Sequence, residues 1–142
     1  IAIFSFYLAF AGMRFARNRK GIATTLDWIA VSLMILAGLG MLILSAIFFS
    51  NDDSQYIVLL VFGFLAITLG YADFKSYKNN TATGKERISR HLTNMMGGTI
   101  AVITAVLVVN PPFEPEWVWW VLPTILITPL IFWWNFKILK KE

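Results

Sequence analysis

The sequence predicts an all-α fold: a polytopic transmembrane helical bundle that forms one integral-membrane domain over residues 1–142. Composition is the first reason, because 58% of the residues are apolar and 14% are charged. Soluble domains have about 45–50% apolar and about 25% charged residues. The mean hydropathy of +0.68 agrees with a chain that faces lipid. The second reason is that the apolar residues fall in long runs separated by short polar segments, as bilayer-spanning helices require.

Four of these runs are long enough, or nearly so, for a helix to cross the hydrocarbon core, which takes about 20 residues. The run over residues 1–13 is shorter, and its basic residues follow the apolar stretch. A signal peptide has the opposite order. We therefore expect this run to be the second half of an N-terminally truncated span, with further helices upstream. The predicted spans are residues 1–16, 25–49, 55–73, 91–109 and 117–136.

Positive charge is confined to alternate connecting segments. All 12 Lys and Arg residues fall within residues 14–20, 75–90 and 137–141, which five spans place on one side of the membrane. The two other loops contain only negative charge, at Asp52, Asp53, Glu114 and Glu116. The positive-inside rule then predicts a bacterial inner-membrane protein with a cytoplasmic C-terminus. The basic pI reflects this topology, so we expect the lipid bilayer as the partner and no nucleic acid.

Local signals mark several helix ends. Thr24 and Asp27 have the spacing of a capping box, with Thr24 as N-cap. A second such pattern at residues 83–86 indicates that the fourth helix begins before the membrane. Asn110 and the two prolines after it predict the end of that helix. Pro115 suits the first turn of the last helix.

Small residues and prolines indicate how the helices pack. Gly97, Gly98 and Ala101 lie on the fourth span, where small residues allow close helix approach in lipid. The stripe predicts packing within the bundle, or the seam of a homo-oligomer or of a membrane complex. Pro123 and Pro129 lie inside the last span and predict kinks, or a broken helix that lines a transport site. The hydroxyls of Thr124 and Thr128 are expected to compensate the freed carbonyls.

Four polar residues are predicted to lie at similar depth near the basic ends of the helices: Asp27, Asp73, His91 and Asn94. The capping box accounts for Asp27. A carboxylate near a helix C-terminus opposes the helix dipole, so Asp73 is expected either to pair with Arg14 or Arg17 or to be functional. His91 and Asn94 share a helix face. His91 is therefore either a proton acceptor or axial ligand in a pocket beside Gly97 and Gly98, or a solvated interfacial histidine.

The chain has no cysteine and one histidine, which excludes disulfides, thiol catalysis and a multi-histidine metal site within one chain. Phosphate-binding glycine loops, serine or cysteine nucleophile motifs and HExxH are absent from the sequence. We predict no catalytic residue, no metal ligand and no cofactor. The preferred function is a non-enzymatic accessory or transporter-like bundle. The alternatives are a redox protein in which His91 ligates haem or contacts a quinone, and a lipid-modifying enzyme that uses the polar cluster.

Two stretches carry a resemblance. They are residues 91–110, beginning His91-Leu92-Thr93-Asn94, and residues 119–131 with their Pro-Thr and Thr-Pro pairs. Together they resemble a group of bacterial multi-pass membrane proteins assigned to a domain of unknown function, most closely over residues 91–134. Ile127 stands where that group has a glycine. The resemblance implies no activity, but it singles out a set of residues for joint testing: His91, Asn110, Pro123, Thr124 and Pro129.

Overall fold

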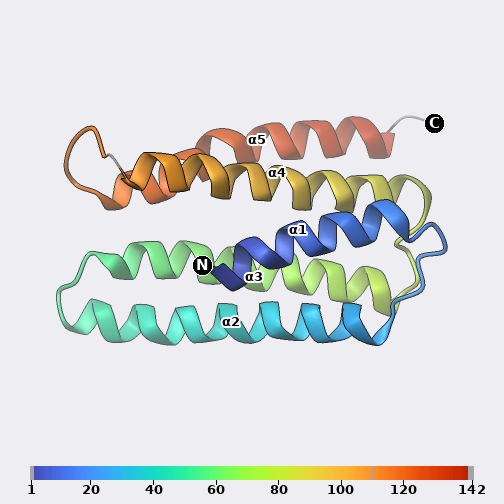
Figure 1. Ribbon diagram of the computed structural model, residues 1–142, viewed down its shortest axis with the longest axis horizontal. Coiled ribbons are helices and arrows are strands. Elements are labelled where there is room, and N and C mark those ends of the chain that lie inside the picture. The colour runs from blue at the N-terminus through green and yellow to red at the C-terminus, as the bar shows by residue number, and fades with distance from the viewer. Residues whose placement is uncertain (1, 110, 141–142) are drawn as a thin grey trace.

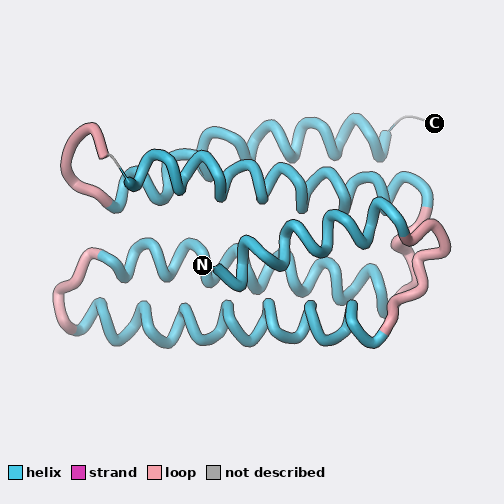
Figure 2. The backbone as a smooth tube through the Cα atoms, in the orientation of Figure 1, coloured by secondary structure: helices cyan, strands magenta, loops and turns pink. Residues whose placement is uncertain are grey.

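The computed structural model describes residues 2–109 and 111–140 as five α-helices joined by short loops (Figure 2). No β-strand occurs in these residues, so the predicted all-α class is confirmed. The helices are α1 (Ala2–Arg17), α2 (Thr25–Ser50), α3 (Gln55–Lys78), α4 (Gly84–Val109) and α5 (Trp117–Lys140).

Helices α2 to α5 are each long and apolar enough to cross a membrane. The chain is therefore a multi-pass membrane protein whose helices contact the lipid bilayer. The helix α1 has 16 residues and is shorter than these four. The helix α3 continues to Lys78, beyond the predicted span, and α4 begins at Gly84, where the pattern at residues 83–86 predicts a helix start ahead of the span from residue 91. Hydropathy marks only the apolar part of a helix, whereas backbone hydrogen bonding continues into the polar turns beyond it.

The helices form two antiparallel hairpins with α1 between them (Figure 1). One hairpin is α2 with α3 and the other is α4 with α5, while α1 packs against both α4 and α2. The α1–α2 loop, the α3–α4 loop and the end of α5 lie at one end of the bundle, which we call the basic end. The acidic loops lie at the opposite end (Figure 1).

The core centres on α1, which buries aromatic and aliphatic side chains against its neighbours. Leu8, Phe15, Met34 and Phe62 are almost completely buried. The ring of Phe4 meets that of Phe62 edge-on, with 5.4 Å between the ring centroids. The short first helix therefore buries one face against the other helices, while Ile3, Phe6 and Met13 on its other face are exposed.

Glycines set the closest helix approaches. A Cβ added at Gly38 of α2 would lie 3.0 Å from the carbonyl oxygen of Gly63 on α3. On α4, a Cβ at Gly97 would lie 3.1 Å from Leu8 of α1, whereas one at Gly98 would meet open space. The predicted small-residue stripe therefore divides, with Gly97 facing α1 and Gly98 facing outward. Ala101 is half-buried on the same helix.

The last helix runs without interruption through both of its prolines, Pro123 and Pro129. The hydroxyl of Thr124 is buried but has no hydrogen-bond partner. The expectation that it compensates a carbonyl freed by a proline is therefore wrong. Asn110, which was expected to end α4, lies outside the described residues.

Candidate functional site

The predicted polar cluster divides into separate contacts, and Asp27 belongs to the first of them. Arg14 of α1 holds this carboxylate with two atoms, Nε at 2.6 Å from Oδ1 and Nη2 at 2.7 Å from Oδ2. The backbone N–H and the hydroxyl of Thr24 also donate to Asp27 Oδ2, at 2.7 and 2.8 Å. The predicted capping box is present. Asp27 thus caps the N-terminus of α2 and ties this helix to α1 at the basic end.

Asp73 has different partners from those expected. The hydroxyl of Tyr7 donates to its Oδ2 at 2.7 Å, and Asn94 Nδ2 lies 3.4 Å from the same oxygen. Its cation is Arg90, with Nη1 at 3.8 Å from Oδ1. The expected pairing of Asp73 with Arg14 or Arg17 is therefore wrong, since Arg14 is already bound to Asp27.

Arg90 connects the buried carboxylate of Asp73 to polar side chains at the basic end. Its Nε donates to Glu86 Oε1 at 2.9 Å and to Ser76 Oγ at 3.1 Å. The hydroxyl of Ser76 donates in turn to Glu86 Oε1, at 3.1 Å. Residues 86 and 90 are one helical turn apart on α4, so their side chains meet on one face. Arg90 therefore lies between two carboxylates, which together carry one more charge than it does.

His91 turns away from this network and contacts the backbone of α1. Its Nδ1 lies 2.8 Å from the carbonyl oxygen of Gly12, and because a carbonyl only accepts, Nδ1 carries the proton and donates. Arg87 donates to the carbonyls of Phe15 and Ala16 at 3.0 and 2.7 Å, which satisfies the C-terminal end of α1. His91 thus fastens α1 to α4, apart from Asp73 and Asn94.

Asn94 is buried and only partly satisfied. Its Nδ2 donates to the carbonyl of Arg90 at 3.0 Å, while its Oδ1 has no hydrogen-bond partner. Of the four predicted site residues, the structure brings together only Asp73 and Asn94.

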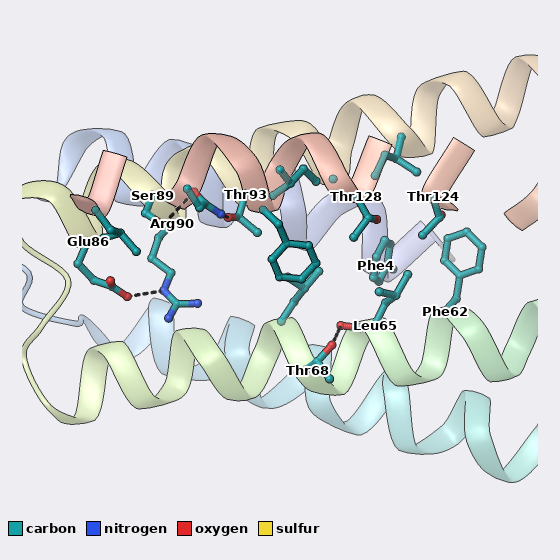
Figure 3. Close-up of a pocket in the computed structure, with 17 residues that line it drawn as sticks. Phe4, Phe62, Leu65, Thr68, Glu86, Ser89, Arg90, Thr93, Thr124 and Thr128 are labelled. Carbon is teal, nitrogen blue, oxygen red and sulfur yellow. Dashed lines mark hydrogen bonds and ion pairs between the residues drawn. The ribbon is translucent and has the colours of Figure 1, made fainter. Parts of the chain in front are cut away.

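A cavity lies beside the Arg90 network, between α3, α4 and α5, and we call it the α3–α5 cleft (Figure 3). Its volume is about 410 Å³, within the range of small-molecule sites. The lining on α5 extends from Thr124 to Leu139, which corresponds to about 22 Å of helix rise. Glu86 and Arg90 lie at its basic end, whereas His91 does not line it.

The two walls of the cleft differ in chemistry. Figure 3 shows Thr93, Thr124 and Thr128 on one side, from α4 and α5, and the side chains of Phe4, Phe62 and Leu65 on the other. Asn135 extends the polar wall, because it accepts from Ser89 at 2.9 Å and donates to Thr93 at 2.7 Å. Apart from Thr68, the polar lining of the cleft therefore comes from α4 and α5, where it is interspersed with apolar side chains such as Ile100 and Ile131.

Sequence reasoning missed Tyr7, Arg90 and Asn135. Two signals pointed to them: Glu86 and Arg90 have the spacing of a helical ion pair, and Asn135 is an isolated amide in an aromatic segment. Tyr7 carried no signal, since its contact with Asp73 joins residues far apart in the chain. Among the described residues, His, Asp and Glu side chains do not gather as a metal site.

Comparisons of the chain with protein-family models, with curated proteins and with solved structures give no match.

Proposed function

We propose that the protein is a non-enzymatic, transporter-like bundle of a bacterial inner membrane that takes up a membrane-soluble molecule in the α3–α5 cleft. The single observation that carries this proposal is the cleft itself, which combines an apolar wall, a polar wall and a charged end at Arg90. The basic end and the C-terminus face the cytoplasm in this proposal, in agreement with the positive-inside rule. The resemblance of residues 91–134 to a family of bacterial multi-pass proteins supports a bacterial membrane as the location.

The cleft favours binding over a purely structural accessory function. A bundle that serves only as a scaffold has no need for a cavity of about 410 Å³ beside buried polar groups, because empty space costs packing contacts. The contacts of Asp73 and Arg90 with Tyr7 and Glu86 are structural, since each joins two helices or two turns. They hold α1, α3 and α4 together at the end of the cleft.

A photo-crosslinking experiment tests this proposal. A small diazirine amino acid is placed at Ile131, which is buried and lines the cleft, or at Ile125 on the same helix, which is exposed to lipid. After irradiation in native membranes, intact-mass spectrometry identifies the adducts. We expect a discrete adduct at position 131 and a mixture of bulk phospholipids at position 125. The same mixture at both positions would mean that the cleft is ordinary lipid-facing space, and the proposal would be wrong.

A further inference from the structure

The side chains that keep free hydrogen-bonding capacity on the α4–α5 wall of the cleft are hydroxyls, and each has a proton that it can donate. The hydroxyl of Thr93 accepts from Asn135, so its own proton is available to another partner. Thr128 makes no side-chain hydrogen bond within the described residues, and Thr124 Oγ1 is buried without a partner. Thr68, on the opposite wall, donates to the carbonyls of Phe64 and Leu65 in its own helix. Free donors therefore belong to the wall formed by α4 and α5.

Both carboxylates that contact Arg90 already have partners, although only Glu86 lines the cleft. Asp73 receives Tyr7 and Arg90, and Glu86 receives Arg90 and Ser76. Two carboxylates face the single positive charge of Arg90, so this end of the cleft carries an excess of one negative charge and would repel an anionic head group. A cationic head group would have to lose its water beside carboxylates that already accept from Arg90, Tyr7 and Ser76, and this desolvation is costly.

We propose that the α3–α5 cleft binds an uncharged, chain-like amphiphile that carries ether, ester or carbonyl oxygens along one edge. The hydroxyls of Thr93, Thr128 and Thr124 donate to these oxygens, and the hydrocarbon edge packs on Phe4, Phe62 and Leu65 (Figure 3). Residues 124 and 128 are one turn apart, so their hydroxyls lie on the same face of α5. A buried hydroxyl without a partner is costly, and such a ligand satisfies it at Thr124. This ligand class deepens the proposed function and rests on it.

The test uses four photoactivatable probes with the same alkyl chain. One ends in a short oligo(ethylene glycol) ether, one in a carboxylate, one in trimethylammonium, and one is plain hydrocarbon. The full chain in lipid nanodiscs is irradiated over a range of probe concentrations, and labelled peptides are quantified. We expect the ether probe to label the cleft-lining residues of α4 and α5 at the lowest concentration.

The decisive variant is Thr124→Val, which removes one hydroxyl and keeps the shape of the side chain. Loss of one hydrogen bond should weaken labelling by the ether probe about two- to tenfold and leave the hydrocarbon probe unchanged. Thr104→Val is the matched control, because the hydroxyl of Thr104 is also buried without a partner but does not line the cleft. If Thr124→Val leaves ether labelling unchanged, or weakens labelling by both probes equally, the Thr124 hydroxyl does not donate to an oxygen of the ligand and the proposed ligand class is wrong.

Thr128→Trp fills the cleft. It therefore tests whether the cleft binds any probe, separately from which class of ligand it prefers. It should abolish cleft labelling by the ether probe while the protein keeps its elution profile and thermal midpoint. If the carboxylate or ammonium probe labels the cleft best and Thr128→Trp blocks it, the proposed function holds but the ligand class is wrong. If no probe responds to Thr128→Trp in folded protein, the cleft binds none of them and both proposals fail.

Discussion

The hydroxyl of Tyr7, in the short first helix, donates a 2.7 Å hydrogen bond to the carboxylate of Asp73 in α3. Both side chains are almost completely buried. A hydrogen bond to a buried charged acceptor is among the stronger single contacts in a protein. This contact adds a polar tie between α1 and α3, beside the ring contacts of Phe4 with Phe62 and of Phe15 with Tyr77.

Replacing Tyr7 by Phe tests that contact. The loss of one donor to a buried carboxylate should lower the free energy of unfolding by about 1–3 kcal/mol. Thermal or denaturant unfolding in detergent measures the change. Tyr71→Phe removes the same atom from an exposed side chain and should alter stability by no more than about 0.5 kcal/mol. Equal effects of the two substitutions would show that the Asp73 contact contributes nothing.

Arg14→Met should destabilise the protein strongly, since it leaves the buried carboxylate of Asp27 without a cation. Arg14 is partly exposed and Asp27 keeps two donors from Thr24, so the expected loss is about 1–3 kcal/mol. The double variant Arg14→Met/Asp27→Asn should lose less than the two single variants together, because no uncompensated charge is then buried. Unfolding of the wild-type protein, of Arg14→Met, of Asp27→Asn and of the double variant gives the coupling free energy between the two side chains. Additive losses would mean that the two side chains act independently.

Gly38→Ala should weaken the α2–α3 hairpin. Its new methyl group would meet Ala66 Cβ and the carbonyl oxygen of Gly63, both at 3.0 Å, and overpacking of this kind costs about 1–3 kcal/mol. Gly40 lies on the same helix with no atom within 4 Å of the added Cβ. Gly40→Ala should therefore be neutral or stabilise the helix by about 0.5–1 kcal/mol. A comparison of unfolding midpoints distinguishes the two positions, and a tolerated Gly38→Ala would contradict the close approach.

The proposed orientation can be tested with single cysteines, because the chain has none of its own. Asp53→Cys lies in an acidic loop and Lys78→Cys at the basic end, and both positions are exposed. An impermeant thiol reagent added to the outside of spheroplasts should label residue 53 and spare residue 78, while disruption of the membrane should expose both. The reverse pattern of labelling would invert the topology.

His91 provides a test of the redox alternative. Its Nδ1 donates to the carbonyl of Gly12, and it does not line the α3–α5 cleft. We expect the purified full-length protein to show only tryptophan and tyrosine absorption, before and after reduction. A Soret band that shifts on reduction and is lost in His91→Ala would favour haem over the binding function proposed above.

The sequence by itself determined the fold class, the four long spans, the common end of all basic segments and the capping box at Thr24. These features depend on hydropathy, charge and short-range spacing, which a single chain displays directly. It also placed Asp73 and Asn94 at similar depth. Hydropathy alone could not locate the end of α3 or the start of α4, because helices continue through polar turns outside the apolar segment, although the pattern at residues 83–86 did indicate where α4 starts.

Only the tertiary structure decided which polar groups meet. Arg14 and Arg17 were the predicted cations for Asp73, but the packing of α1 between the hairpins gives Arg14 to Asp27 and leaves Arg90 as the cation for Asp73. The same packing places His91 against Gly12 and leaves a cleft between α3 and α5. Helix rotation and helix neighbours are set by the fit of side chains from distant segments, and no local pattern in the sequence encodes that fit.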